Sequence, residues 1–372
     1  MKANYIQIIP VEDKGQLDKF IKFPWKVYKS NPYWVPPLIS ERKKFLNPKE
    51  NPFFSHAKVK LFLAYKDRKP IGRIAAVIDR QYIDYYKENV GYFGLFETLK
   101  DYSIAVSLFN EAEKFLKENG MQKILGPVNL STNHECGLLI EGFNLPPTAM
   151  MPYNPQYYQE YIERYGFKKA KDLHSYFIDF GKFDNGIFEK IKKRMSYKDF
   201  KIRPIRLNDP EEEKKIKDIY NSIWSENWGF VPLTKEEFSY IAKELKKILI
   251  PDLALAVEKD GELVGFNLCI PDINQVLKKI NGRLFPFGIF KWLYFSRKID
   301  LTRGLTVGIK KEYRHTLGPL LYLKIAEVSK EKGYHKWEIG WVLEDNNIVN
   351  NAIMRKLNPK LYKKYRIFAK DL

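Results

Sequence analysis

One segment of the sequence, residues 303–334, combines residue types that could hold a phosphate group. Peptide N–H groups at the start of a helix are unpaired, and the helix dipole adds about half a positive charge there. Glycine lets an anion approach the backbone, and proline suits a first helical turn because its missing N–H costs nothing. We expect a strand that ends with Val307, Gly308 and Ile309, a turn of Tyr313, Arg314, His315, Thr316, Leu317 and Gly318, and a helix with Pro319 in its first turn. An ordinary strand-to-helix turn would show a similar pattern.

Carboxylates mark a second place where chemistry could occur, the end of the apolar stretch WEIGWVLE. Glu344, Asp345 and Asn346 end this stretch with more polar residues than a turn needs. A carboxylate there can accept a proton, directly or through water, so Glu344 is the first candidate for a general base. Glu338, within the same stretch, is the second. Asp345 and Asn346 could instead form a turn that caps the next helix.

The segment 126–158 is a long insertion rich in Asn, Gly and Pro. Long ordered segments of this kind inside compact domains are usually functional. Its polar residues could hydrogen-bond the polar head group of a substrate, and the candidates are Asn129, Asn133, Glu135 and Asn154. The alternative is an elaborate turn held by Asn side chains.

The elements that must position these residues occur twice. Residues 61–79 resemble 253–272, a strand, a charged turn and a strand, and residues 112–126 resemble 326–340, an amphipathic helix that ends at Gly120 or Gly333 before a strand. A third pair, 161–180 and 353–371, predicts a helix followed by a closing strand. Each half therefore consists of helices, a hairpin, a strand, a helix, a strand, a helix and a strand.

This repeat predicts two copies of one α/β domain. We expect an N-terminal domain over 1–182, a linker over 183–200 and a C-terminal domain over 201–372. A chain of 372 residues fits two domains of ordinary size.

The order of elements and several motifs resemble the GNAT acyltransferase superfamily, here in tandem. The stronger match is in the C-terminal half, in RGLTVGIKKEYRHTLGPLLYLKIAEVSKEKGY and WEIGWVLEDN. The stretches NPFFSHAKVKLFLA, GPVNLSTNHECGLLIEGF, PYNPQYY, NGRLFPFG and GWVLEDN resemble a narrower group of bacterial double-GNAT proteins, which is associated with the bacterial ceramide synthases. The resemblance implies two tandem GNAT domains, each with a mixed, largely antiparallel sheet flanked by helices.

The resemblance also implies that coenzyme A, as acetyl-CoA or acyl-CoA, is the co-substrate. The superfamily pattern is Arg or Gln, two residues, Gly, one residue, then Gly or Ala. Aligning Gly318 with the first Gly puts His315 at the Arg/Gln position and Leu320 at the last; placing Arg314 there instead misses both glycines. The residues that the resemblance assigns to coenzyme A are Val307, Gly308, Ile309, Arg314, His315, Thr316, Gly318 and Asn346.

Direct attack of an amine on the thioester would then need a base and a proton donor for the leaving thiolate. Glu344 would be the base, and Tyr362 or Tyr365 would be the donor, since the superfamily often uses a Tyr before the final strand. A packed aromatic role for either Tyr is the alternative. The N-terminal half has FETLKDYS in place of the loop, with Glu97 and Asp101 expected to repel phosphate. We expect this half to lack coenzyme binding and to shape the acceptor side.

Residues 281–299, NGRLFPFGIFKWLYFSRKI, interrupt the repeat with aromatic residues among four cations, Arg283, Lys291, Arg297 and Lys298. Such a segment suits a membrane interface or a long acyl chain. The alternative is a helix packed between the two domains, with its aromatic side chains hidden.

Composition restricts the remaining functions. The chain holds 64 Lys and Arg against 45 Asp and Glu, a net charge of +19, which favours an anionic partner. No zinc-finger, RRM or KH signature accompanies it, so nucleic acid is not the expected partner. Cys136 and Cys269 make no disulfide framework, and five scattered His predict no metal site. Without a signal peptide or spanning stretch, we expect a cytoplasmic protein, with peripheral contact at the inner membrane face through 281–299.

The leading hypothesis is an acyl-CoA-dependent N-acyltransferase with a small-molecule or lipid amine as acceptor. Two alternatives remain: an aminoacyl-tRNA-dependent transferase, and a degenerate GNAT pair that binds without catalysis. The sequence predicts no particular acyl length or oligomeric state.

Overall fold

The computed structural model describes residues 5–180, 199–346 and 359–372. The chain forms two compact units, each made of segments distant in sequence. The first unit comprises Met1–Asp172, Leu277–Trp292 and Lys363–Leu372, and the second comprises Leu173–Val276 and Leu293–Tyr362. None of the helices among the described residues is long and apolar enough to cross a membrane.

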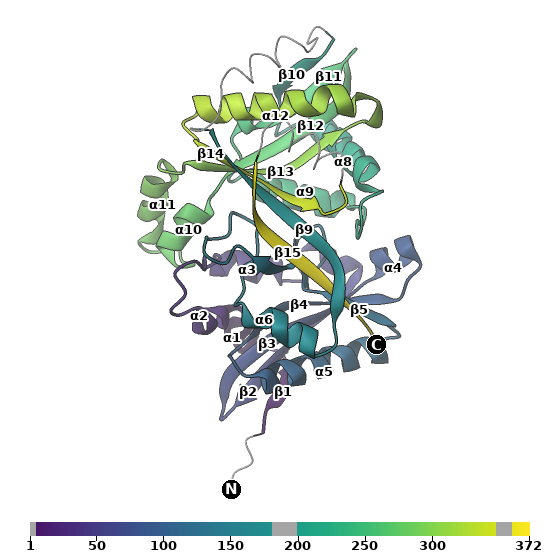
Figure 1. Ribbon diagram of the computed structural model, residues 1–372, viewed down its shortest axis with the longest axis vertical. Helices are drawn as coiled ribbons and strands as arrows, with labels where there is room; N and C mark the ends of the chain where they lie inside the picture. Colours follow the sequence, from purple (N-terminus) through teal and green to yellow (C-terminus); the bar gives the residue numbers. More distant parts are fainter. Residues whose placement is uncertain (1–4, 181–198, 347–358) are drawn as a thin grey trace. The chain divides into compact units, whose positions relative to one another are not determined.

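The first unit contains a mixed sheet whose only parallel pair is formed by β4 and β5 among its described strands (Figure 1). The strand order is β1 (Gln7–Pro10), β2 (Ala57–Lys66), β3 (Lys69–Asp79), β4 (Val90–Thr98), β5 (Lys123–Gly126) and β15 (Lys360–Asp371), with β8 (Leu138–Glu141) also paired to β15. A two-stranded sheet pairs β6 (Val128–Asn129) with β7 (Glu135–Cys136). The helices are α1 (Lys14–Lys22), α2 (Pro24–Val27), α3 (Ile39–Phe45), η1 (Pro52–Ser55), α4 (Arg80–Tyr86), α5 (Tyr102–Glu118) and α6 (Tyr157–Arg164).

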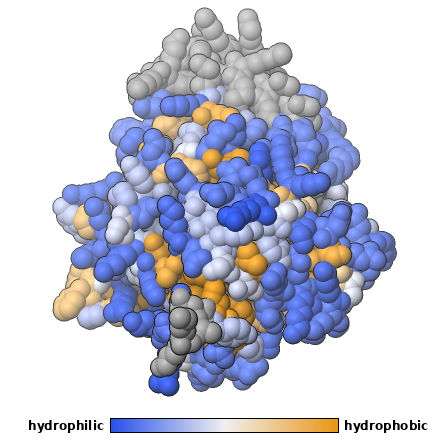
Figure 2. All heavy atoms as spheres, turned by 60° about the horizontal axis from the view of Figure 1, so that its bottom comes forward, coloured by the Kyte–Doolittle hydropathy of each residue, from blue (hydrophilic) through white to orange (hydrophobic). Residues whose placement is uncertain are grey.

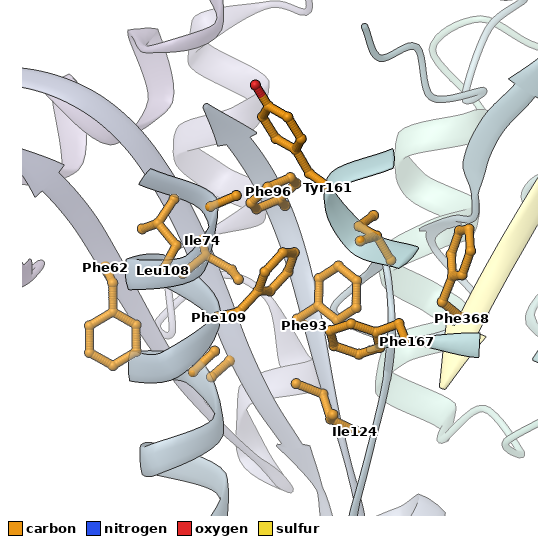
Figure 3. Close-up of a cluster of buried hydrophobic side chains, with 14 of the residues drawn as sticks. Phe62, Ile74, Phe93, Phe96, Leu108, Phe109, Ile124, Tyr161, Phe167 and Phe368 are labelled. Atoms are coloured by element: carbon orange, nitrogen blue, oxygen red, sulfur yellow. The ribbon is translucent and has the colours of Figure 1, made fainter. Parts of the chain in front are cut away.

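The core of this unit is aromatic and lies between the sheet and the helices α5 and α6 (Figure 3). Phe93 and Phe96 of β4 pack against Phe109 of α5, with ring centroids 5.3 and 4.7 Å from Phe109. Phe368 of β15 belongs to the same cluster and is fully buried. The heavy aromatic content of the sequence is therefore used in part to fill this core.

The second unit repeats the arrangement. Its strand order is β9 (Lys168–Asp179), β14 (Lys336–Leu343), β13 (Leu301–Ile309), β12 (Glu262–Pro271), β11 (Ala254–Lys259) and β10 (Lys201–Pro204), with β13 and β14 parallel and the other neighbours antiparallel. The helices are α8 (Pro210–Trp224), α9 (Lys235–Leu245), η3 (Pro251–Leu253), η4 (Lys311–Tyr313) and α12 (Arg314–Glu331). Two more helices, α10 (Asn274–Ile280) and α11 (Gly288–Ser296), are divided between the units, because Leu277–Trp292 belongs to the first. Phe266 of β12 and Ile216 and Ile219 of α8 lie in its core. The predicted fold class, two tandem α/β domains with mixed, largely antiparallel sheets, is confirmed.

The repeat extends to the way in which the two long helices end. Gly120 and Gly333 have φ angles of +81° and +87°, the left-handed region that glycine enters without strain. In both copies the next residue's amide returns to the last turn: Met121 N donates to Leu116 O at 3.0 Å, and Tyr334 N to Ser329 O at 2.9 Å. These are Schellman motifs, as the two glycines predict.

The closing strands β9 and β15 differ from what sequence order suggests. Residues 173–179 of β9 pair with β14 in the second unit, whereas residues 368–371 of β15 pair with β5 in the first. The two halves have thus exchanged their last strands. The boundaries predicted above, 1–182 and 201–372, describe the repeat in the sequence rather than the packed units. Most of the predicted linker, 183–198, lies outside the described residues.

Candidate active site

The central feature of the second unit is a fork between its two parallel strands. The ladder of β13 and β14 begins with Leu301 opposite Lys336 and ends with Gly304 opposite Ile339. Beyond that pair, β13 continues along β12 to Ile309, and β14 continues along β9 to Leu343. In the described part of the chain, no ladder pair joins the facing edges 305–309 and 340–343. Peptide N–H and C=O groups on these edges are thus positioned to bind an extended ligand.

A buried ion pair lies at the vertex of this fork. Arg303 of β13 and Glu338 of β14 are neighbours in the ladder, with Arg303 Nε 3.2 Å from a Glu338 oxygen, and both side chains are 5% exposed or less. Arg303 Nη2 also donates to Gly340 O at 3.1 Å, so this side chain connects the paired part of the two strands to the start of the open edge. Because Glu338 is buried and paired, it is placed to position the fork rather than to take a proton from a substrate.

The start of α12 lies at the open end of the fork, since β13 leads to it through Lys310 and η4. Tyr313, the residue before the helix, supplies no side-chain cap, and His315 and Thr316 in the first turn are exposed. The amides of Tyr313 and Arg314 are used, because they donate to Lys310 O and Lys311 O. The positions that remain for an anion are therefore at His315 and beyond.

The predicted turn over Arg314–Gly318 is wrong, because these residues already form the first five positions of α12. The chain turns earlier, in η4, and Pro319 is the sixth helical residue rather than part of the first turn. Proline removes the helical bond to the carbonyl of His315, which leaves the helix start less tightly bonded. Gly318 has room for a Cβ atom, which would make only an ordinary contact with Ile309 Cδ1 at 3.9 Å.

Cations surround the start of α12. Lys310 pairs with Glu262 at 3.3 Å, Lys311 pairs with Glu226, and Arg314 Nε donates to Ile309 O at 3.3 Å. Glu312 of η4 is a third carboxylate in this segment, so the three cations are matched in number, and Arg314 holds the strand end to the helix start. The uncapped helix and its exposed first turn, with cations beside it, suit a diphosphate.

The other candidate residues of the C-terminal half lie at the end of β13 or directly after β14. Val307, Gly308 and Ile309 do form the end of β13, as predicted, although Gly308 has a packing reason to lack a side chain: a Cβ atom would lie 2.4 Å from Phe266 Cε1. Glu344 is half-buried in the turn directly after β14, and Asn346 N donates to Leu343 O at 3.0 Å. Parallel strands bring their carboxyl ends to one edge, so Glu344 and the start of α12 follow the same end of the fork.

The two candidate tyrosines belong to different compact units. Both lie within β15, not before it as expected. Tyr362 belongs to the second unit, where its ring lies 5.6 Å from that of Phe177. Tyr365 belongs to the first unit, opposite Leu139 and fully buried. A role for either Tyr as the proton donor stays a prediction.

The first unit contains the same fork, but its own chain fills it. The parallel ladder of β4 and β5 ends with Tyr92 opposite Leu125. Beyond it, Asn129 of β6 accepts a hydrogen bond from Leu95 N at 2.7 Å, and a Cβ atom at Gly94 would lie 2.1 Å from Val128 O. The insertion after β5 thus occupies the edge that is open in the second unit.

The remaining candidates of the insertion have intramolecular partners. Arg42 forms two hydrogen bonds to Glu135, at 3.0 and 3.2 Å, and Asn129 forms a third at 3.1 Å. Burial opposes ionisation of Glu135, but Arg42 and Asn129 outweigh it and lower its pKa. Asn154 bonds the N–H and C=O of Leu139, and Asn133 N donates to Ser131 Oγ at 3.3 Å. These contacts favour the alternative of a turn held by polar side chains, and a role in substrate binding stays a prediction.

The start of α5 in the first unit is closed as well. Asp101, expected to repel phosphate, accepts a hydrogen bond from Ser103 N at 2.9 Å and caps the helix. A carboxylate therefore occupies the place that an anion would take. This cap and the filled fork give physical reasons for the prediction that this half lacks coenzyme binding.

Sequence reasoning missed the environment of Glu97 in β4. Its carboxylate, 9% exposed, lies 2.9 Å from the hydroxyl of Tyr28, 2.8 Å from that of Tyr158 and 3.8 Å from Arg73 Nη2. Burial raises the pKa of Glu97 to about 7, against the opposite effect of Arg73 and the two tyrosines. A lone acid in the apolar stretch VGYFGLFET was the available signal.

No cluster of three or more His, Cys, Asp or Glu side chains suited to a metal ion occurs among the described residues. No protein-family model matches the chain. The fold is similar to that of a tandem GNAT protein from the clavulanic acid biosynthesis pathway, with a TM-score of 0.61, 11% identity and coverage of 99% of this chain and 98% of the other. A probable N-acyltransferase from Enterococcus faecalis has a TM-score of 0.55 at 9% identity, covering 99% of this chain and 73% of that one.

Two curated proteins are similar in sequence over almost their whole length. Protein YghO of Escherichia coli is 35% identical over 370 residues, 97% of this chain and 94% of that protein. The bacterial ceramide synthase of Caulobacter vibrioides is 34% identical over 380 residues, 99% of this chain and 98% of that protein. With the duplicated fold described above, this similarity shows that the chain belongs to the family of tandem GNAT proteins that includes YghO and bacterial ceramide synthase.

Proposed function

We propose that the protein is an acyl-CoA-dependent N-acyltransferase in which an amine attacks the thioester directly. The observation that carries the proposal is the open fork between β13 and β14, with the uncapped start of α12 and Glu344 following the same end. In the first unit the equivalent fork and helix start are closed by Asn129 and Asp101, so the proposal places the reaction in the second unit.

The residues then divide the work of acyl transfer. The first turn of α12, from His315 onward, would hold the diphosphate of coenzyme A, with Arg314 and Lys310 beside it. Backbone N–H groups on the edge 305–309 would donate to the thioester oxygen as negative charge develops on it. As the new C–N bond forms, Glu344 would take the amine proton; the C–S bond then breaks and the thiolate leaves with the electron pair.

The leaving thiolate needs a proton donor. Tyr362 is the better candidate of the two tyrosines, because it is half-buried and belongs to the same unit as the fork. Tyr365 is fully buried in the first unit, and we assign it a packing role.

For the acceptor we propose a lipid amine. The relative from Caulobacter vibrioides is named a ceramide synthase, and ceramide is an amide of a long-chain amine. Its similarity extends over 99% of this chain, which favours an acceptor of the same class. The test compares the rates of acylation of long-chain amines and of short polar amines, each offered with palmitoyl-CoA and with acetyl-CoA. Faster acylation of the long-chain amines would favour the lipid acceptor over a small-molecule one.

Coenzyme binding can be tested with a charge placed in the first turn of α12. In Thr316→Glu the new carboxylate suits the helix dipole, which is worth about 0.3–1 kcal/mol, so the fold should not suffer. The same carboxylate would stand where the diphosphate lies and repel it. We expect coenzyme A to raise the thermal unfolding midpoint of the wild type and of the uncharged control Thr316→Gln, but not of Thr316→Glu. An equal midpoint shift in all three proteins would contradict the proposed site.

The base can be tested separately from binding. We expect Glu344→Gln to lower kcat by roughly 10²–10⁴-fold, the usual contribution of a general base, while the midpoint shift with coenzyme A persists. Asp345→Asn, a change at the exposed neighbour, is the control and should keep most activity. Wild-type turnover in Glu344→Gln would exclude Glu344 as the base.

Coenzyme binding without turnover of any amine would favour a non-catalytic pair, and tight, salt-sensitive tRNA binding would favour an aminoacyl-tRNA-dependent transferase.

A further inference from the structure

The segment with α10 and α11 leaves its aromatic side chains in solvent. Figure 2 shows one face of the molecule, mostly hydrophilic with separate hydrophobic patches. Five large apolar side chains of this segment are more than half exposed: Phe285 76%, Phe287 73%, Phe290 68%, Leu293 56% and Tyr294 57%. The expectation that these aromatic residues are hidden in packing is therefore wrong for this face.

These side chains form a continuous apolar face rather than scattered contacts. Phe290, Leu293 and Tyr294 are spaced by three and four residues in α11, so they lie on one side of the helix. Phe287 immediately precedes the helix, at three residues from Phe290. In α10, by contrast, Val276, Leu277 and Ile280 are buried, at 8% exposure or less. An exposed face of this kind on a folded protein marks an interaction site.

The turn between the two helices belongs to the first unit and is held firmly within it. Trp25 Nε1 donates to Asn281 Oδ1 at 2.9 Å, and Ile39 N donates to Gly282 O at 3.0 Å. Gly282 has a φ angle of +75°, and a Cβ atom there would lie 2.5 Å from Trp25 Cζ2. The apolar face is thus presented by a fixed element and not by a loose loop.

The charge of the segment is of one sign. Between Asp272 and Asp300 the chain has no acidic residue and six basic ones, Lys278, Lys279, Arg283, Lys291, Arg297 and Lys298. Five of them, Lys278, Arg283, Lys291, Arg297 and Lys298, form no ion pair with a carboxylate in the part of the chain that the structure describes. Lys298 instead lies 4.3 Å from the centroid of the Tyr294 ring and donates to its hydroxyl at 2.7 Å. Lys291 in α11 and Lys298 at Tyr294 thus border the apolar face without a carboxylate partner among the described residues.

We propose that the face formed by Phe285, Phe287, Phe290, Leu293 and Tyr294 docks on an anionic lipid bilayer. Aromatic and Leu side chains would enter the boundary between head groups and acyl chains, and the bordering cations would contact anionic head groups. Charge argues against a second copy as the occupant, because the segment has six cations and no acid, and pairing it with itself would bring like charges together. The proposal concerns where the protein binds and does not depend on acyl transfer.

Co-sedimentation of the full chain with vesicles tests this surface. We expect the protein to sediment with vesicles containing one-third phosphatidylglycerol, less so at high salt, and not with phosphatidylcholine alone. Phe287→Ser/Phe290→Ser and Lys291→Glu/Lys298→Glu should each weaken vesicle partition by about tenfold or more. The matched controls are Leu145→Ser/Met150→Ser, which alter exposed apolar residues elsewhere, and Lys100→Glu/Lys214→Glu, which change the net charge equally. Both controls should partition as the wild type does.

Several outcomes would overturn the docking surface. These are no sedimentation of the wild type with anionic vesicles, equal binding to neutral ones, wild-type partition of the α11 variants, or loss of partition in the controls. Equal thermal unfolding midpoints would show that the variants fold. If they do not fold, amide exchange of the wild type decides: vesicles should protect residues 285–298, and unchanged exchange there would refute the proposal.

Discussion

At the scale of single residues, Glu97 shows how burial and hydrogen bonding compete. Each hydroxyl near it has one proton and more than one acceptor: Tyr28 is 2.9 Å from Glu97 and 3.0 Å from Tyr153 O, and Tyr158 is 2.8 Å from Glu97 and 3.1 Å from Thr98 O. An ionised Glu97 draws both protons and leaves the carbonyls without them. These two donors stabilise the ionised form of Glu97 and lower its pKa, but burial has the larger effect, so the carboxyl holds its proton more readily than an exposed Glu would.

This preference predicts a pH-dependent stability. The pKa of Glu97 is raised from 4.5 to about 7 by burial, so between these values the folded state binds a proton that the unfolded state has lost. The free energy of unfolding therefore falls as pH rises through this window, by at most about 3 kcal/mol. Glu97→Gln has no such proton, and its stability should change less over the same range. Urea denaturation at a series of pH values measures this.

The control for this prediction is Glu118→Gln, which removes the same charge from an exposed position at the end of α5. It should keep the slope of the wild type between pH 4.5 and pH 7. Parallel curves for the wild type and Glu97→Gln would show that Glu97 titrates as an ordinary carboxyl in the folded protein.

At the scale of elements, the start of α12 contains a glycine that destabilises the helix, and ligand binding would explain why it is there. Gly318 lies inside the helix and has room for a Cβ atom, so Ala would favour the helix by about 0.5–1 kcal/mol. We expect Gly318→Ala to raise the thermal unfolding midpoint and to weaken coenzyme A binding several-fold, because a side chain would stand near the proposed diphosphate. Unaltered coenzyme affinity would remove Gly318 from the site.

A second glycine provides the comparison. A Cβ atom at Gly308 would lie 2.4 Å from Phe266, so Gly308→Ala should lower the unfolding midpoint instead of raising it. A lower unfolding midpoint in Gly308→Ala and a higher one in Gly318→Ala would show that Gly308 is needed for packing, whereas Gly318 is not.

Local patterns could be predicted from the sequence, and the helix start shows their limit. The hairpins, the strand end at Ile309 and the glycine-terminated helices are confirmed, because each depends on residues close in the chain. The start of α12 was placed too late, because Gly318 and Pro319 suggest a turn, while Tyr313 gives no capping signal. The filling of the first fork by Asn129 could not be predicted, since it depends on a contact between side chain and backbone across the sheet.

The ion pair at the vertex of the second fork could be predicted only in part. Arg303 and Glu338 each interrupt an apolar strand, which is a visible signal in RGLTVGI and WEIGWVL. Only the parallel register, which places them opposite each other, shows that they form a pair. The sequence thus identified Glu338 as unusual but suggested a base, whereas its burial with Arg303 indicates a positioning role.

At the scale of the whole molecule, the exchange of β9 and β15 links the two halves of the repeat. Both strands follow a similar pattern and end their half of the sequence, so nothing local indicates which sheet edge each will join. The structure settles this by register: Phe368 of β15 lies opposite Gly126 of β5, and its side chain belongs to the core of the first unit. Residues from the end of the chain thereby complete the fold that its beginning starts.

The exchange can be tested by removing one buried ring at the end of the chain. Phe368→Ala should cost about 3–5 kcal/mol, and the loss should appear in the first unit, as faster amide exchange in β4 and α5, hundreds of residues before the substitution. Phe266→Ala, in the core of the second unit, is the matched control and should speed exchange in β11, β12 and α8 instead. If the units followed the order of the sequence, Phe368→Ala would loosen β13 and β14 and leave β4 and α5 protected. That result would contradict the exchange of closing strands, because the ring would then have stabilised its own half of the repeat.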